Sequence, residues 1–351
     1  MKNSITKVVT IFMLLLANAF YAQNIVTVDN NINSSANFTS LQSAIDSAEN
    51  NDFIYLYPSE LSYGNCTIDK KVHLRGIGHT PEVSNGIPAS VGTINFINNN
   101  PATNAIASGG SISGLVIAGV SLPIANNINN ITIENNKIGN IGSSNNNDNW
   151  VIRGNIFSNN ISVGPACNNW LIVNNFFNLG PNSALAGLRN DTNVNNNIFV
   201  LPSSSTPFNI FSDSFCIASN NIFIAQNAAV TSVNVAANGS NVILSNNLSF
   251  NTAGTALTAL PGTGNYNNTN PSFASITPST NYNYSIANNY QISNAALVGT
   301  DGTPIGIFGL NFPFNSRGYS FSMPYIESMT ILNPTIPVNG TLQIDVTSKS
   351  N

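Results

Sequence analysis

Charged residues are scarce in this chain. Only 7% of its 351 residues are Asp, Glu, Lys or Arg, whereas an average soluble protein contains about 25%. The 14 acidic and 10 basic residues give a formal net charge of −4, and no Lys- and Arg-rich cluster occurs. A protein that binds nucleic acid by neutralising phosphates needs such a cluster. We therefore exclude nucleic acid as a partner.

Cysteine and histidine are also rare. Cys66, Cys167 and Cys216 are widely spaced and odd in number, and the two histidines are His73 and His79. This set matches neither a disulfide framework nor a zinc site. We therefore expect the cysteines to be small buried side chains, and we expect no resident metal ion or other cofactor.

Asparagine takes the place of the missing charges, with 65 residues. Hydrophobic residues make up 42% of the chain, which is too high a share for an intrinsically disordered protein. The composition therefore predicts a folded protein with a polar surface that carries little charge.

Residues 1–22 have the pattern of a secretory signal peptide. Lys2 and Lys7 give a positive start, an apolar run follows, and Ala19 and Ala22 offer two cleavage sites. The apolar run is shorter than the ~20 residues that a membrane-spanning helix needs. The sequence thus predicts a secreted or cell-surface protein with no membrane span in its mature form.

A short segment recurs six times between residues 131 and 249. Each copy has an asparagine at a fixed position, which we call the anchor. The anchors are Asn136, Asn155, Asn175, Asn197, Asn221 and Asn247. Their spacing grows from roughly 19 to roughly 26 residues, which is in the range typical of solenoid proteins.

Two columns of the aligned repeats are apolar in nearly every copy. The column three positions before the anchor holds Ile133, Ile152, Ile172, Val194, Ala218 and Leu244, and the column two positions after it holds Ile138, Phe157, Phe177, Phe199, Phe223 and Ser249. Such spacing fits strands better than helices. Trp150 and Trp170 share a further column. We expect them in the core, with a sugar-stacking platform as the alternative.

The position just before the anchor predicts a tight corner. It is asparagine in five copies and Gly154 in the sixth, and both residue types adopt a left-handed backbone conformation at low cost. Anchors stacked at the strand spacing of ~4.8 Å can form a ladder of side-chain amide hydrogen bonds. The pattern therefore predicts an all-β fold, a parallel solenoid of about ten coils.

Three stretches resemble secreted bacterial β-helix proteins of the pectate-lyase-like superfamily. They are Phe38–Pro58, Cys66–Gly78 and Asn294–Gly309. The resemblance spans roughly residues 36–318 and implies a right-handed parallel β-helix, which we assign to residues 23–320. It is weak evidence for activity, because this fold carries many functions.

The resemblance also implies how the two ends are built. A short helix should cap the first coil, with Leu41, Ala44, Ile45 and Ala48 on its apolar face. Asn294–Gly309 should form the last coils of the β-helix. Residues 321–351 contain two more strand patterns, and we expect them to form a β tail or cap.

An enzyme remains an alternative because of the same resemblance. Lyases of this superfamily use acidic residues to bind Ca²⁺ and an Arg or Lys to abstract a proton, and inverting hydrolases use paired carboxylates. The weak catalytic candidates are Glu134, Asp148, Arg153, Arg189 and Asp191. We favour a structural explanation for them. Glu134 with Arg153, and Arg189 with Asp213, occupy matching positions in adjacent coils, where exposed salt bridges contribute ~0–1 kcal/mol.

These observations favour an exported, non-catalytic β-helix protein that binds an extended polymer, a glycan above all, through a polar face of low charge. One alternative is a polysaccharide lyase or glycoside hydrolase, which would use Ca²⁺ if it is a lyase. The other is a structural adhesin or spacer rod. We expect the protein to be a monomer.

Overall fold

The computed structural model describes residues 24–350, except 83, 99–106, 123–126, 144–145, 180–183, 202–207, 235–240, 278–280, 320–323 and 334. The expected signal peptide, residues 1–22, lies outside the described residues. In the part of the chain that is described, no helix combines the length and the hydropathy needed to cross a membrane.

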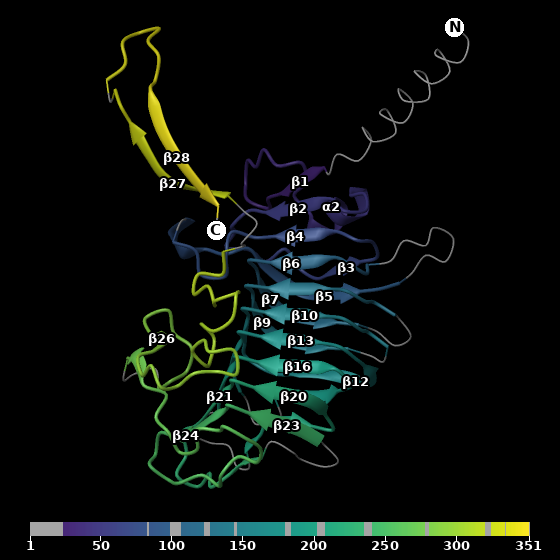
Figure 1. Ribbon diagram of the computed structural model, residues 1–351. Coiled ribbons are helices and arrows are strands. Elements are labelled where there is room, and N and C mark those ends of the chain that lie inside the picture. The colour runs from purple at the N-terminus through teal and green to yellow at the C-terminus, as the bar shows by residue number, and fades with distance from the viewer. Residues whose placement is uncertain are drawn as a thin grey trace, which may run out of the picture.

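The chain winds into a parallel β-solenoid, and one face of it is a ten-stranded sheet that we call sheet A (Figure 1). Its strands, in stacking order, are β1 (Ile25–Val28), β2 (Phe53–Leu56), β4 (His73–Arg75), β6 (Ser111–Ser113), β8 (Thr132–Glu134), β10 (Val151–Arg153), β13 (Leu171–Val173), β16 (Thr192–Asn195), β20 (Phe215–Ser219) and β23 (Asn241–Ser245). The solenoid makes about 8 turns, slightly fewer than the expected ten, and is consistent with a right-handed β-helix.

A second sheet, sheet B, forms the rest of the solenoid wall. Its twelve strands are β3 (Cys66–Ile68), β5 (Ser90–Phe96), β7 (Val116–Ser121), β9 (Lys137–Gly142), β11 (Ile156–Phe157), β12 (Ile161–Cys167), β14 (Phe176–Asn178), β15 (Leu185–Leu188), β17 (Ile198–Val200), β19 (Phe211–Ser212), β21 (Ile222–Ala225) and β24 (Leu248–Asn251). Strand β9 pairs with both β11 and β12. Sheet B therefore divides into two arms from this coil onward.

The capping helix is present as expected. It is α2 (Leu41–Ser47), and the side chain of Ser40 caps it by accepting a hydrogen bond from the Ser43 amide at 3.3 Å. Leu41, Ala44 and Ile45 are buried, as their spacing predicts. The helix therefore covers the apolar end of the first coil.

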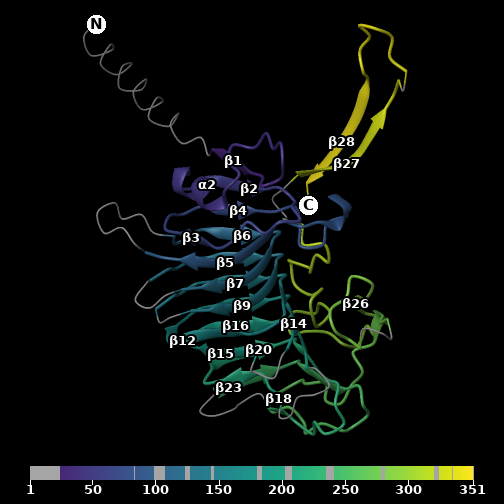
Figure 2. The same ribbon diagram turned by 180° about the vertical axis from the view of Figure 1, so that it is seen from behind.

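Few elements lie outside the two large sheets. They are the 3₁₀ turn η1 (Ser84–Gly86), the pair β18 (Phe208–Asn209) and β22 (Val233–Asn234), the pair β25 (Phe273–Ser275) and β26 (Asn289–Ile292), and the antiparallel pair β27 (Pro324–Ile331) and β28 (Ile344–Ser350). Figures 1 and 2 show the last pair extending away from the solenoid. The two strands β27 and β28 thus form an antiparallel pair, which we call the β tail.

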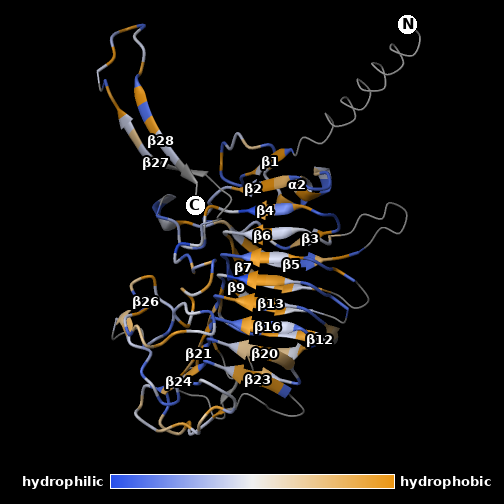
Figure 3. Cartoon of the chain, viewed as in Figure 1, coloured by the Kyte–Doolittle hydropathy of each residue, from blue (hydrophilic) through white to orange (hydrophobic). Residues whose placement is uncertain are grey.

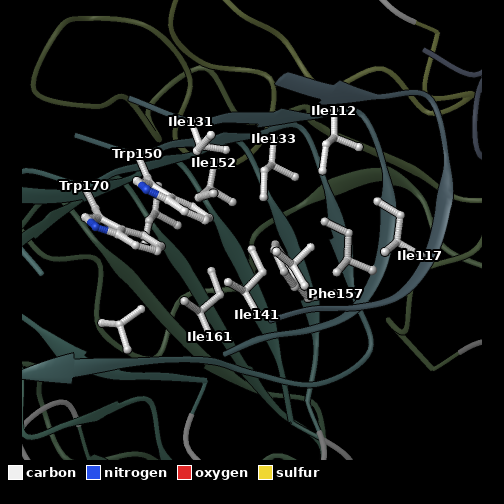
Figure 4. Close-up of a cluster of buried hydrophobic side chains, with 14 of the residues drawn as sticks. Ile112, Ile117, Ile131, Ile133, Ile141, Trp150, Ile152, Phe157, Ile161 and Trp170 are labelled. Atoms are coloured by element: carbon white, nitrogen blue, oxygen red, sulfur yellow. The ribbon is translucent and has the colours of Figure 1, made fainter. Parts of the chain in front are cut away.

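The interior of the solenoid consists of stacked columns of like side chains (Figure 4). The rings of Phe157 and Phe177 lie 4.8 Å apart, and those of Phe177 and Phe199 lie 4.7 Å apart. Trp150 and Trp170 are fully buried and stack at 4.8 Å. The core interpretation of both columns is confirmed. The three cysteines are also buried.

The anchor asparagines form a continuous buried ladder. The Oδ1 atom of Asn175 accepts hydrogen bonds from the backbone and side-chain amides of Asn155 at 2.9 and 3.0 Å, and its Nδ2 donates to Oδ1 of Asn197 at 3.0 Å. The same contacts link the other anchors, and the ladder continues to Asn265 through the backbone amide of Asn247. Asn265 lies outside the aligned repeats, so the alignment did not find it.

The residue before each anchor has the left-handed conformation that the sequence predicts. We call these six residues the corner column: Asn135, Gly154, Asn174, Asn196, Asn220 and Asn246. Their φ angles lie between 52° and 64°. Each coil therefore passes from sheet A to sheet B through a single tight corner, which leaves the asparagine carboxamides pointing out of the stack.

The end of the solenoid differs from the expectation. Asn294–Gly309 does not form closing coils, because after Tyr266, which still pairs with Leu248 of β24, the chain leaves the stack and returns along its flank (Figures 1 and 2). We call residues 294–319 the strap. The corner column binds it through the residue pairs Asn246–Val298, Asn220–Thr300, Asn196–Gly306, Asn174–Gly309 and Asn135–Tyr319. The strap therefore runs antiparallel to the order of the coils.

The returning chain encloses a second apolar core against the outer surface of sheet B. One outward row of this sheet is Ile156, Phe176, Ile198, Ile222 and Leu248. The side chains that pack against it include Tyr290, Leu297, Ile305, Ile307 and Phe314. The strands β11, β14, β17 and β21 are thus apolar on both faces, and their outer face depends on the C-terminal segment for cover.

His79 is buried against the C-terminal end of the strap. This burial makes the stability of the protein depend on pH. The ring packs directly beneath Gly318, where a Cβ atom would lie 2.2 Å from the imidazole. Burial, together with the charge of Lys137, lowers the pKa of His79 to about 3. The unfolded chain, with a histidine pKa near 6.5, therefore binds a proton below pH 6.5 that the folded chain rejects.

We expect this histidine to lower the free energy of unfolding by about 2 kcal/mol between pH 7 and pH 5. Urea unfolding at the two pH values measures the change. A His79→Asn variant is the control, because it should lose less stability over this range than the wild type does. Equal losses in both proteins would contradict the assignment.

Candidate functional site

Glu134 and Arg153 form an ion pair, but it is not exposed. The Nη2 and Oε2 atoms lie 2.5 Å apart, and the side chains are 7% and 22% exposed for Glu134 and Arg153. The guanidinium group also lies 4.1 Å from the ring centroid of Phe312, which belongs to the strap. The pairing was predicted, whereas its cover by the strap was not.

Arg189 and Asp213 also form the predicted pair. Their Nη2 and Oδ2 atoms lie 2.8 Å apart, and the Asp213 side chain is 62% exposed. The guanidinium group stands 5.2 Å from the ring centroid of Phe215. This contact fits the expected surface salt bridge, whose contribution to stability is small.

Asp148 and Asp191 have structural positions in the turns that precede sheet A. Oδ1 of Asp148 accepts a hydrogen bond from the Asn168 amide at 2.7 Å, and the Asp148 amide donates to Oδ1 of Asn129 at 2.7 Å. Asp191 has a φ of 59°, close to that of Asn169 one coil earlier. Aspartate tolerates this conformation much as asparagine does, so both acids help to turn the chain.

The five catalytic candidates therefore do not meet in one place. Glu134 and Arg153 end their strands of sheet A, whereas Asp148, Arg189 and Asp191 lie in turns before such strands. Within the described ranges, no group of three or more His, Cys, Asp or Glu side chains could hold a metal ion. The candidates thus occupy two different parts of the coil, the ends of sheet A strands and the turns before them.

The side chains that point outward from sheet A form two rows, and in the second row Arg75, Ser113, Glu134, Val173 and Ser219 are buried. The first row is Phe53, His73, Ser111, Thr132, Val151, Leu171, Asn193, Ile217 and Ile243, and the second is Tyr55, Arg75, Ser113, Glu134, Arg153, Val173, Asn195, Ser219 and Ser245. In Figure 3 the ribbon is mostly hydrophilic at β4 and mostly hydrophobic at β2 and β23. These colours include the inward-facing residues of each strand.

A pocket of about 380 Å³ opens at the N-terminal end of this face. Its lining residues are Ile25, Thr27, Tyr55, Leu56, Tyr57, Arg75, Gly76 and Ile77. Thr27, Tyr55 and Arg75 are successive members of one row across β1, β2 and β4. The ring of Tyr57 is about half exposed. Parallel pairing thus brings hydroxyl, aromatic and cationic groups together on three neighbouring strands.

Arg75 is the charged group of the pocket. The residue is only 6% exposed, its guanidinium carbon lies 5.3 Å from the ring centroid of Phe53, and its Nη1 donates to the Leu74 carbonyl at 3.0 Å. Burial lowers the pKa of Arg75, and the charges of Glu134 and Tyr55 partly oppose that shift. The group still carries its proton at neutral pH, because an arginine pKa starts above 12.

The neighbouring His73 is neutral at pH 7. Burial is the main cause that lowers the pKa of His73 to about 4, and the charges of Arg75 and Lys71 add to it. Nδ1 of His73 lies 2.7 Å from the Ser111 hydroxyl. The histidine therefore adds a polar contact beside the pocket without adding charge.

The sequence did not single out Tyr55, Tyr57 or Arg75. All three lie in stretches that resemble a β-helix entry, but the first coils have no anchor asparagine to fix their alignment. Without that register, the placement of Thr27, Tyr55 and Arg75 in one row could not be derived. Comparison of the chain with protein-family models, with curated proteins and with solved structures found no match.

Proposed function

We propose that this chain is an exported β-solenoid that binds an extended polymer, a glycan, on the outer face of sheet A and does not cleave it. The observation that carries the proposal is the pocket lined by Tyr55, Tyr57 and Arg75 at the end of that face. Mostly apolar and aromatic walls with a few polar groups are typical of small-molecule sites. Export rests on the signal-peptide pattern of residues 1–22.

The shape of the face supports an elongated ligand. Ten strands stacked at the usual spacing of ~4.8 Å give a surface roughly 45 Å long, and the residues of both rows recur once per strand. Apart from His73, Arg75 and the Glu134–Arg153 pair, these rows contain no ionisable side chain except that of Tyr55. The side chains of the first row, apart from Ser111, are partly or fully exposed, so an extended polymer can contact successive coils along that row.

The absence of cleavage is part of the proposal because the candidate acids occupy separate positions. Glu134 is engaged by Arg153, and Asp148 and Asp191 shape turns. An inverting hydrolase needs two carboxylates about 6.5–9.5 Å apart on either side of a bond. The proposal therefore assigns these side chains to the architecture of the coils.

Binding to a panel of soluble polysaccharides in affinity electrophoresis tests the proposal. We expect at least one polymer to retard the mature protein, and we expect Tyr57→Ala to weaken that binding roughly fivefold, since stacking on one ring contributes about 1 kcal/mol. Leu332→Ala, which removes an exposed side chain from the β tail, should leave binding unchanged.

Each other outcome favours an alternative function. If no polymer binds, the proposal is wrong and a spacer or adhesin role gains support. If a bound polymer acquires new chain ends or products that absorb in the ultraviolet during incubation, the protein is an enzyme. If Tyr57→Ala and Leu332→Ala behave alike, the ligand binds elsewhere than the pocket.

A further inference from the structure

Arg75 is a buried cation without an ion-pair partner in the described part of the chain. The ion pairs found there involve Arg153, Arg189 and Arg317 instead. The Nε atom of Arg75 is buried and meets no hydrogen-bond acceptor among the described residues. A buried charge is costly unless an opposite charge and hydrogen bonds compensate it. Among the described residues, no opposite charge contacts Arg75 to supply that compensation.

The nearest acid in the same row is already engaged. Ser113 separates Arg75 from Glu134, and Glu134 receives two hydrogen bonds from Arg153, at 2.7 and 2.5 Å. The charge of Glu134 therefore affects Arg75 only from a distance, by an electrostatic attraction that raises the pKa of Arg75. An anion that compensates Arg75 at contact distance must therefore come from outside the described chain.

The pocket gives such an anion access to Arg75. Arg75 is the one charged residue in the pocket lining, and the other lining groups are apolar, aromatic or hydroxyl-bearing. Its volume of about 380 Å³ is at the lower end for small-molecule sites. This size suits one unit of a polymer and not a long segment of it. The guanidinium fork matches the planar or tetrahedral oxygens of a carboxylate or sulfate.

The net charge of the chain would not by itself attract an anionic ligand to this pocket. The whole chain has a formal charge of −4, so its overall field repels polyanions weakly. A preference for an anionic ligand would therefore have to come from a local contact. Only the environment of Arg75 offers one inside this pocket.

We infer that the pocket binds a cyclic, oxyanion-bearing unit, whose carboxylate or sulfate contacts Arg75 while its ring lies against Tyr55 and Tyr57. This inference rests on the proposed function and narrows it, since the polymer must then carry acidic substituents. Thr27 lines the same pocket from the neighbouring strand, but its hydroxyl group already donates to Oδ1 of Asn37 at 2.8 Å. The neutral His73 beside the row adds no competing charge.

Titration of the mature protein with three monosaccharides tests the inference directly. The probes are glucose, glucuronate and glucose 6-sulfate, followed by NMR at 150 mM NaCl. We expect one or both acidic sugars to bind at least tenfold more tightly than glucose, and their relative affinities tell carboxylate from sulfate. In Arg75→Met this preference should disappear, whereas Arg75→Lys should retain part of it.

Two further measurements separate binding from folding. Arg75→Met removes an uncompensated buried charge, so its thermal unfolding temperature should equal or exceed that of the wild type. Arg189→Met is the matched control, because it removes an arginine that lies outside the pocket and is paired with Asp213. This control should keep the full preference for acidic sugars.

The outcomes distinguish this inference from the proposed function. Polymer binding without any preference for acidic sugars, or a preference that survives in Arg75→Met, overturns the inference and leaves the proposed function intact. Binding of acidic sugars without binding of any polymer overturns the proposed function alone. If none of the three probes binds at 100 mM, the pocket is not a sugar site.

Discussion

Replacing Asn175 with alanine is expected to lower the free energy of unfolding by about 4 kcal/mol. Its side chain is fully buried in the middle of the ladder. The substitution leaves the backbone amide of Asn155 without its acceptor, which lies at 2.9 Å, and it removes the donor to the Ile152 carbonyl at 2.8 Å. Each buried polar group that loses its partner costs about 1–3 kcal/mol, and the small cavity adds to that cost.

The matched control is Asn193→Ala on the next coil. Asn193 points outward from sheet A, and its carboxamide makes one long contact of 3.3 Å to the Asp191 carbonyl. We expect a loss below about 0.5 kcal/mol for this variant. Denaturant unfolding of both proteins measures the difference. Similar values for the two would mean that the ladder does not hold the coils together.

The ladder and the corners could be predicted because they recur in every copy. A carboxamide at one position of the repeat has the same neighbours one coil above and one coil below, so the hydrogen bonds of Asn155 predict those of Asn175. The same holds for the left-handed corners, where asparagine and Gly154 both tolerate the positive φ angle. Repetition thus converts a local preference into a long-range structure.

The strap could not be predicted in this way. The corner asparagines hold it mainly through its backbone carbonyls, such as those of Gly306 and Gly309, and any sequence supplies such groups. The stretch Asn294–Gly309 also resembles the closing coils of β-helix proteins, which misdirected the prediction. A backbone-mediated contact leaves no pattern in the side chains that a single sequence can show.

A signal for the strap was nevertheless present in the repeat. Ile156, Phe176 and Ile198 are apolar although their neighbours Phe157, Phe177 and Phe199 already face inward. Successive residues of a strand face opposite sides of a sheet, so two adjacent apolar columns indicate a wall with apolar surfaces on both sides. The outer column required a covering segment, and the C-terminal part of the chain supplies it.

The acidic residues within the repeats show a second limit of what the sequence can predict, since a rare charge need not mark a functional site. Asp148 stands between Asn129 and Asn168 in a column of hydrogen-bonded turn residues, and Asp191 follows Asn169 in a column with positive φ. The first position suits a short side chain with an oxygen atom, and the second suits a residue that tolerates positive φ. An acidic residue in such a column is no stronger evidence for catalysis than the asparagines that hold the same position in the adjacent coils. Arg75 is different, because the groups around it do not compensate its charge. The environment of a charge, and not its rarity, identifies a candidate site.

Replacing Phe176 with alanine is expected to cost about 3–5 kcal/mol, as much as the same change at Phe177. The two side chains leave β14 on opposite faces, and both are fully buried. Phe177 stacks inside the solenoid, whereas Phe176 packs outside it, with ring centroids 4.8 Å from Tyr290 and 5.4 Å from Tyr284. The two substitutions are expected to cost the same, because the C-terminal segment buries Phe176 in a second apolar core on the outer face of sheet B.

Phe312→Ala provides the comparison within the strap, and denaturant unfolding measures all three variants. The Phe312 side chain is 43% exposed and mainly covers the guanidinium group of Arg153, so we expect its removal to cost at most about 1 kcal/mol. A loss in Phe176→Ala no greater than that in Phe312→Ala would mean that the C-terminal segment does not pack on sheet B in solution. A large loss would mean that the solenoid and its returning chain unfold together, since the outer face of sheet B cannot remain apolar and uncovered in water.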